Sequence, residues 1–141
     1  MDRELIERKL EDLERYAEEL KKVQEKSLKE IRASLLTSWG IEHGLQLAIQ
    51  SLIDLGAYML ASLGEHRVED YKDVIDRLGE RGIIPADFSR RIRRMAGFRN
   101  ILVHEYAEVD LGMVRDYLKH RLGDFEQFAR YIRRYLDKSS A

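Results

Sequence analysis

The sequence predicts an all-α fold, a single antiparallel bundle of about five helices that associates as a homodimer. Leu, Glu, Lys, Arg and Ala dominate its 141 residues, proline occurs once, at Pro85, and alternating β-branched residues are nearly absent. Such a composition favours helices over strands. Hydrophobic residues make up 44% of the chain and charged residues 36%, so one core can form and one domain is expected over residues 1–141.

The first segment predicts an amphipathic helix from about Asp2 to the early thirties. Its apolar residues recur at steps of three and four and form one stripe on a charged helix: Ile6, Leu10, Leu13, Ala17 and Leu20.

A second helix is expected from about Ala33 to Leu63, with apolar residues around nearly its whole circumference. Such a helix must be buried on more than one side, and we expect one face in the bundle and another against a second subunit. Polar interruptions make it a poor membrane span: Glu42, His43, Gln46, Gln50 and Asp54. An unpaired Asp54 carboxylate would be costly in this helix, so we expect it to meet a cation or a hydroxyl.

Three shorter helical stretches follow. After a loop at residues 64–67, a helix is expected from about Glu69 to Gly79, with Gly82 as a stop signal. Pro85 opens the next helix from a first-turn position, and Asp87 favours its N-terminal dipole. The helical pattern fails over residues 106–110, and a last helix is expected from about Leu111 to Leu136.

Charge is unevenly distributed along the chain, although the net charge is −1. The last third, residues 86–141, holds 12 basic and 8 acidic side chains. The absence of cysteine excludes disulfides, thiolate nucleophiles and sulfur-ligated zinc. His43, His66 and His120 show no convergent metal-ligand spacing, so no bound metal is expected. The N-terminus lacks the apolar core of a signal peptide, and a cytoplasmic location without membrane attachment is expected.

Chemistry concentrates at Arg99, His104 and Tyr106, where the helical pattern begins to fail. An arginine can hold two phosphate oxygens, and a histidine moves protons near neutral pH, so the pair suffices for metal-free cleavage of RNA. Five residues place positions 99 and 104 about 140° apart on an ideal helix. Either the helix ends between them, or two chains contribute to one site.

The segment Phe98–Tyr106 resembles the Arg-x4-His-x-Tyr signature of HepT-like HEPN proteins. The resemblance to this family extends from about Ser38 to Tyr131. It includes residues that lead into the helix with Arg99 and residues that follow it: Gly82–Pro85, Met95–Asn100, Val109, Asp110, Val114 and Tyr117. The resemblance implies a HEPN-like helical fold.

It also implies a function. Family members are metal-independent endoribonuclease toxins of type VII-like toxin–antitoxin systems, and their dimers form one cleft from both Arg/His motifs. Arg99, Asn100 and His104 match that motif. The implied partner is an MntA-like minimal nucleotidyltransferase antitoxin that transfers AMP from ATP to Tyr106, which would block the site with bulk and negative charge. ATP and Mg would serve the partner, and no cofactor is implied for this chain.

Simpler roles stay open for the same residues. Arg99 could pair with Glu105 or Asp110, His104 could cap a helix end, and Tyr106 could be an interface residue. Asp54 could orient Arg99 or His104. The basic run that includes Arg90, Arg91, Arg93 and Arg94 is either a solvated helix face or a guide for RNA.

Two other functions also stay open. The chain could be a non-catalytic helical binding subunit of a nucleotidyltransferase. It could also be a dimerisation domain without nucleotide chemistry.

Overall fold

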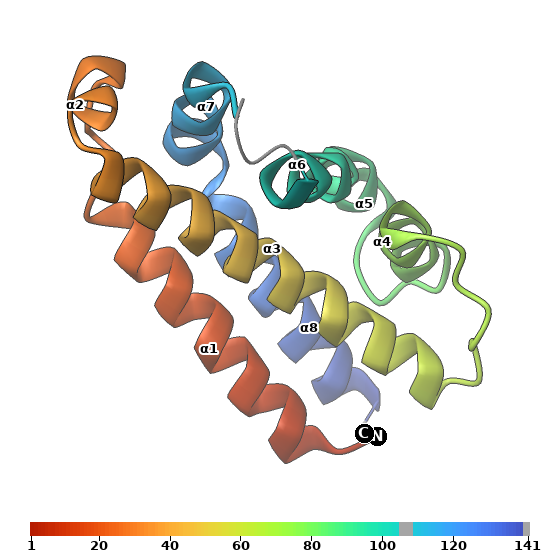
Figure 1. Ribbon diagram of the computed structural model, residues 1–141. Coiled ribbons are helices and arrows are strands. Elements are labelled where there is room, and N and C mark those ends of the chain that lie inside the picture. The colour runs from red at the N-terminus through yellow and green to blue at the C-terminus, as the bar shows by residue number, and fades with distance from the viewer. Residues whose placement is uncertain (105–108, 140–141) are drawn as a thin grey trace.

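The computed structural model describes residues 1–104 and 109–139, with the backbone alone at His104. These residues form helices and no strand, so the all-α prediction is confirmed (Figure 1). In chain order the helices are α1 (Arg3–Lys21), α2 (Leu28–Ala33), α3 (Leu35–Ser62), α4 (Tyr71–Glu80), α5 (Ala86–Ile92), α6 (Arg94–His104), α7 (Leu111–Arg121) and α8 (Gly123–Ser139).

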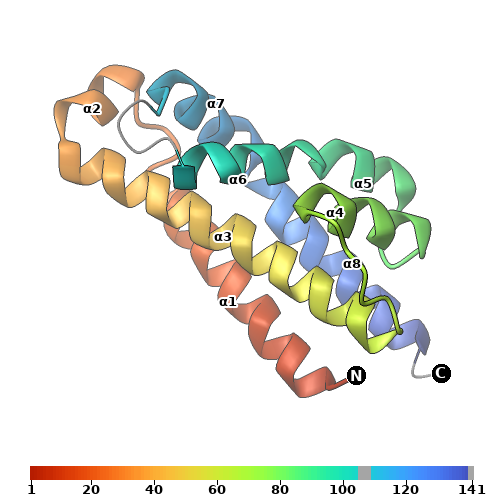
Figure 2. The ribbon, with the colours of Figure 1, turned by 45° about the vertical axis from the view of Figure 1, so that its right-hand side comes forward.

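The long helices α1, α3 and α8 lie side by side, and α1 runs antiparallel to α3. Helices α4 and α6 pack along another side of α3 and α5 packs against these two, while α2 and α7 lie together at the beginning of α3 (Figures 1 and 2). The last turn of α8 lies near the beginning of α1, where Arg3 pairs with Asp137. Helix α3 is therefore the central element that the other helices surround.

The structure has more helices than the five expected, because three predicted helices are broken. The helix expected from Asp2 breaks after Lys21, and Ser27 and Glu30 form a capping box that starts α2. The helix that Pro85 opens breaks at Arg93, between α5 and α6. The helix expected from Leu111 breaks at Leu122, between α7 and α8. Pro85 is the N-cap of α5, one position before the expected first turn.

The stop signal at Gly82 is confirmed. Gly82 adopts φ +71°, a left-handed conformation that favours glycine. Behind it the backbone N–H of Ile83 donates to the carbonyl of Leu78 at 3.0 Å, and that of Gly82 donates to Gly79 at 3.1 Å. These two bonds form a Schellman motif that ends α4 and turns the chain into α5.

The core is a continuous apolar cluster around α3. The predicted stripe of α1 is buried against it along its whole length, and α8 contributes the largest fully buried side chains, Phe125 and Phe128. The remaining buried residues of α3 include Leu45, Ile49 and Leu52, each with 0% exposure. The packing of one face of the second predicted helix into the bundle is thus confirmed.

A second face of α3 stays exposed in the single chain. We call it the α3 outer face: Leu35, Leu36, Trp39 and Leu47, which are 62%, 77%, 57% and 38% exposed. By length and hydropathy alone α3 could cross a membrane, but half of its most apolar window is buried within the bundle. Large apolar side chains exposed together mark a surface that a partner covers.

Candidate active site

Arg99 is held at the point where α3, α4 and α6 meet. Its Nε donates to Oε1 of Gln50 on α3 at 2.7 Å, and one terminal nitrogen donates to Oδ1 of the adjacent Asn100 at 3.2 Å. The guanidinium carbon lies 4.7 Å from the centre of the Tyr71 ring on α4, a cation–π contact. Three side chains therefore fix the orientation of one cation.

All three of these partners are uncharged. Carboxylates would neutralise the guanidinium, whereas these amide oxygens and this aromatic face orient it without adding a negative charge. Of the five N–H donors that an arginine carries, two are used among the described residues. The remaining donors and the positive charge suit an anion that accepts two hydrogen bonds from one arginine, such as a phosphate.

Gln50 is itself oriented by Asp54, one helical turn further along α3. The Nε2 group of Gln50 donates to Oδ1 of Asp54 at 2.7 Å. Only one orientation of the Gln50 amide satisfies both neighbours, with its N–H toward Asp54 and its oxygen toward Arg99. Asp54 thus acts on Arg99 through Gln50.

The expectation for Asp54 needs correction in one respect. Asp54 is exposed, and the hydrogen bond it accepts comes from an amide, not from a cation or hydroxyl in the described part of the chain. The carboxylate lies on the side of α3 that faces away from the core, so burial imposes no requirement for a counter-ion.

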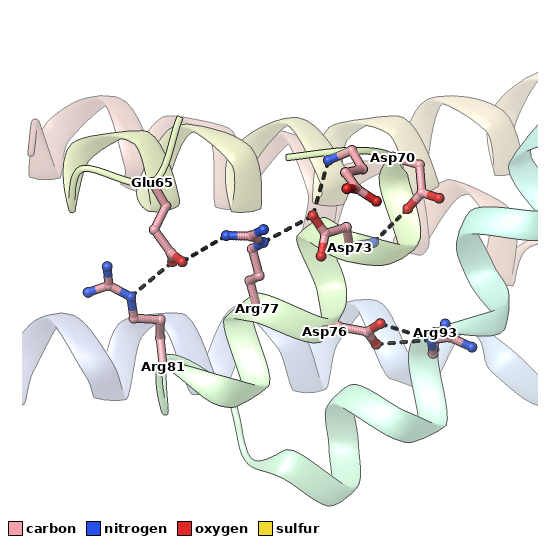
Figure 3. Close-up of polar contacts among 8 residues, drawn as sticks. Glu65, Asp70, Asp73, Asp76, Arg77, Arg81 and Arg93 are labelled. Atoms are coloured by element: carbon pink, nitrogen blue, oxygen red, sulfur yellow. Dashed lines mark hydrogen bonds and ion pairs between the residues drawn. The ribbon is translucent and has the colours of Figure 1, made fainter. Parts of the chain in front are cut away.

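Helix α4, which carries Tyr71, is fixed by a chain of ion pairs (Figure 3). Arg77 bonds to Asp73 at 3.0 Å and to Glu65 at 3.1 Å, and Glu65 also accepts from Arg81 at 2.9 Å. The carboxylates of Asp73 and Glu65 raise the pKa of Arg77. The network joins α4 to the loop before it.

Two further contacts hold α4, one at its beginning and one near its middle (Figure 3). Asp70 caps the helix by accepting from the Asp73 backbone at 2.8 Å, and Asp76 accepts from Arg93 at 3.0 Å, next to the start of α6. The position of the Tyr71 ring relative to α6 is thereby set.

Helix α6 is continuous from Arg99 through His104. The first of the two geometric alternatives, an end of the helix between these positions, is therefore wrong. Positions 99 and 104 lie about 140° apart around α6, as the ideal helix requires. Position 104 falls on the same face of α6 as Gly97 and Ile101, seven and three residues before it.

Other expectations at the motif have mixed outcomes. Tyr106 and Glu105 lie outside the described residues. Asp110 makes no ion pair with Arg99, because its carboxylate caps α7 by accepting from the Gly112 N–H at 2.8 Å.

A hollow of about 860 Å³ opens between α6 and α7. We call it the basic groove, and its lining is mostly cationic and apolar: Lys72, Arg90, Arg91, Arg93, Arg94, Gly97, Phe98, Ile101, Met113, Asp116, Tyr117, His120 and Arg121. It includes Arg90, Arg91 and Arg94, the three arginines expected to bind RNA. Arg91 donates to the buried carboxylate of Asp124 at 2.9 Å, so its charge is engaged within the chain.

Gln50, Tyr71, Lys72 and Arg121 join the site without having been predicted from the sequence. Gln50 could have been suspected, because it interrupts an apolar helix four residues before Asp54, a spacing that brings two side chains together. Tyr71 and Lys72 come from a different helix, and no spacing in the sequence connects them to Arg99.

Sequence comparison places the motif in a family. The model of a family described as "Ribonuclease HepT-like" matches residues 6–132. The chain is 30% identical over 132 residues to a tRNA nuclease HepT of Aphanizomenon flos-aquae, covering 94% of this chain and 90% of that protein. It is also 30% identical over 89 residues to an mRNA nuclease HepT of Shewanella oneidensis, covering 63% of this chain and 67% of that protein.

Solved structures share the fold. A toxin–antitoxin crystal structure with AMP-PNP superposes with a TM-score of 0.84 at 23% identity, covering 93% of this chain and 98% of that one. A tri-AMPylated HEPN toxin of Shewanella oneidensis in complex with an MNT antitoxin superposes with a TM-score of 0.83 at 24% identity, covering 95% and 99%. With its motif, its fold and these relatives, the chain belongs to the HepT-like ribonuclease family.

Proposed function

We propose that this protein is a metal-independent endoribonuclease, the toxin of a type VII-like toxin–antitoxin pair. The observation that carries the proposal is the environment of Arg99, a cation that is oriented by Gln50, Asn100 and Tyr71 and neutralised by none of them. A fixed cation with free N–H donors is what stabilises the charge that develops on a phosphate in its transition state.

In the proposed reaction, His104 accepts the proton of a ribose 2′-hydroxyl. The 2′-oxygen attacks the adjacent phosphorus, the bond from phosphorus to the 5′-oxygen breaks, and that oxygen takes up a proton. Arg99 binds the non-bridging oxygens throughout. Because the nucleophile is the 2′-hydroxyl, RNA is the substrate and DNA is not cleaved.

The protein acts as a homodimer in this proposal. Positions 99 and 104 diverge around a continuous α6, so one phosphate is reached more readily by Arg99 of one protomer and His104 of its partner. The α3 outer face supports this arrangement, since Leu47 lies one turn before Gln50, the residue that holds Arg99. Pairing through that face would bring the two motifs together.

The partner that silences the toxin is a nucleotidyltransferase antitoxin that transfers AMP from ATP to Tyr106, with Mg serving the partner's reaction. The tri-AMPylated state of the Shewanella oneidensis toxin bound to its MNT antitoxin supports this part of the proposal. An attached nucleotide would place phosphate charge beside Arg99 and compete with RNA.

The nuclease is tested with protein purified free of any partner, incubated with RNA in EDTA. The wild type should cut, whereas Arg99→Ala and His104→Ala should lose about 100-fold or more in rate. Arg130→Ala, on the exposed surface of α8, is the matched control and should cut normally. If the wild type leaves RNA intact while binding a nucleotidyltransferase, the protein is instead a non-catalytic binding subunit.

The shared site is tested by mixing the two inactive variants. A dimer of Arg99→Ala with His104→Ala has one site with both mutations and one site with neither, so an equal mixture should regain about a quarter of wild-type activity. No recovery, with subunit exchange verified by mass spectrometry, would place both groups of a site in one protomer.

The modification is tested by co-expression with the neighbouring nucleotidyltransferase. Intact mass should rise by whole AMP increments, and Tyr106→Phe should abolish the increase. If the mass of Tyr106→Phe rises by the same increment, another residue accepts the AMP, and the nuclease proposal still stands.

A further inference from the structure

We propose that the basic groove binds single-stranded RNA beside the cleavage site and receives one unpaired base on its apolar floor. This inference rests on the proposed ribonuclease function and specifies which form of RNA that function uses. Three features of the groove support it: the floor, the rim and the position of the groove relative to residue 104.

The floor of the groove is rigid and apolar. Phe98 of α6 and Tyr117 of α7 stack with ring centres 4.5 Å apart and planes within 2°, which ties the two helices together. Beside this pair lie Ile101, half-buried, and Met113, which is 45% exposed. An apolar surface that remains open between two helices suits the flat face of a nucleobase, because every base has such a face.

The Tyr117 phenol stays neutral. Burial raises its pKa, and the Asp124 carboxylate raises it further. The floor therefore carries no charge that would repel a nucleotide.

The rim is cationic, and its cations are of two kinds. Arg91 and Arg121 are held by the buried Asp124, at 2.9 and 3.9 Å, and Arg93 is held by Asp76. These residues shape the walls.

The exposed side chains of Lys72, Arg90 and Arg94 have no carboxylate partner within residues 1–104 and 109–139. Asp116 is the one acidic side chain among the residues that line the groove. Three unpaired cations around an apolar floor match the chemistry of a nucleotide, with its phosphate at the rim and its base below.

The groove leads to the catalytic motif. Gly97 and Ile101 line it, and position 104 continues their face of α6. A Cβ atom at Gly97 would lie 3.8 Å from Cε of Lys72, so the absence of a side chain leaves room between α4 and α6. RNA lying in the groove would continue toward the phosphate next to His104.

The apolar floor favours unpaired over paired RNA. In an A-form duplex the base faces are stacked on one another and the edges are turned inward, so the apolar floor would meet only backbone. An unpaired base can turn outward and enter. The groove therefore selects single strands, loops or ends.

Binding of a 2′-O-methyl oligoribonucleotide of about 12 nucleotides, by fluorescence anisotropy, tests the inference, since this RNA cannot be cleaved by the proposed reaction. The wild type should bind it about tenfold more tightly than the same strand in a duplex. The double variant Arg90→Glu/Arg94→Glu should weaken binding about 30-fold or more and flatten its salt dependence. Met113→Gln should weaken it about three- to tenfold with the salt dependence unchanged.

The matched control is Arg130→Glu/Lys138→Glu, which makes the same change in charge on exposed positions of α8. Equal weakening by the control would show attraction by net charge and would overturn the groove assignment. Equal affinity for the duplex would overturn it as well. Loss of antitoxin binding by the Arg90→Glu/Arg94→Glu variant, with RNA binding unchanged, would make the groove a protein-docking surface.

The inference and the proposed function fail separately. Single-strand binding that depends on the groove, without cleavage of ordinary RNA, would remove the nuclease and leave the groove assignment intact. If Arg90→Glu/Arg94→Glu cleaves ordinary single-stranded RNA at the wild-type rate, the groove assignment fails and the proposed nuclease stands.

Discussion

Two arginines in this molecule are held firmly by opposite means. Arg133 of α8 lies between two carboxylates of α1, donating to Glu7 at 2.7 and 2.9 Å and to Glu14 at 2.7 and 2.9 Å. Arg99 of α6 instead contacts the side-chain amides of Gln50 and Asn100 and the aromatic ring of Tyr71. One cation is surrounded by negative charge, whereas the partners of the other within residues 1–104 and 109–139 are all neutral.

The difference shows how one residue type serves structure in one place and chemistry in another. Around Arg133 each charge stabilises the other: the hydrogen bonds that it donates to Glu14 and Glu7 raise the pKa of the guanidinium, and Arg133 lowers the pKa of Glu14. Such a cation joins α1 to α8 and has little attraction left for a ligand. Arg99 is positioned without being neutralised, as a phosphate-binding group must be.

The largest effect is expected when Arg99 is given a charged partner. Gln50→Glu should lower kcat for RNA cleavage by about 100-fold, because a carboxylate would neutralise the guanidinium and repel the substrate. Gln50→Met removes the hydrogen bond without adding charge and should cost about tenfold. Rates at saturating RNA measure both.

A control separates this effect from repulsion between two acids, since the new Glu would lie next to Asp54. Gln50→Glu/Asp54→Asn keeps one carboxylate beside Arg99 and should remain as slow as Gln50→Glu. Recovery of the wild-type rate in the double variant would contradict the role given to neutral partners.

The aromatic partner offers a smaller test. Tyr71→Leu should reduce kcat about two- to fivefold, because a cation–π contact contributes about 0.5–1 kcal/mol. Tyr71→Phe retains the ring and should cut at the wild-type rate. If Tyr71→Phe loses as much activity as Tyr71→Leu, the hydroxyl matters and the ring face does not.

Replacement of Arg133, which is paired with two carboxylates, should lower stability and leave the rate of RNA cleavage unchanged. Arg133→Met should lower the free energy of unfolding by about 1 kcal/mol, since its carboxylates remain partly exposed and solvent screens them. Urea denaturation followed by circular dichroism measures this change. A fall in the cleavage rate per folded molecule would show that the α1–α8 pairing reaches the active site.

The smallest effect is a change in acid sensitivity. Arg133, chiefly by its hydrogen bond, holds the pKa of Glu14 below the ordinary value of 4.5. A lowered pKa contributes stability above the unfolded value, and that contribution is lost as pH falls through the folded value. The stability difference between wild type and Arg133→Met should therefore shrink below pH 4.5, and a difference that grows on acidification would contradict it.

The sequence predicted those features of the fold that depend on neighbouring residues alone. The stripe of α1, the stop at Gly82 and the two apolar sides of α3 follow from periodicity and glycine geometry. The break before α2 could also have been predicted, because Ser27 and Glu30 have the spacing of a capping box. Nothing local signals the break at Arg93, where neither proline nor glycine occurs.

The candidate site was predicted only in part for the same reason. Arg99, Asn100 and His104 are neighbours in the chain and share a recognisable spacing. Gln50 is 49 residues from Arg99, and Tyr71 comes from a third helix, so only the packing of α3, α4 and α6 reveals them. The groove arises in the same way, from helices that meet after folding.

The α3 outer face contains the one tryptophan of the sequence. Indole emission shifts to longer wavelength when water surrounds the ring, so Trp39 is an intrinsic optical probe of that surface. If the proposed dimer forms through this face, serial dilution of unlabelled protein should move the emission maximum toward the red as subunits separate. The same titration would then give the dissociation constant of that dimer with no chemical tag.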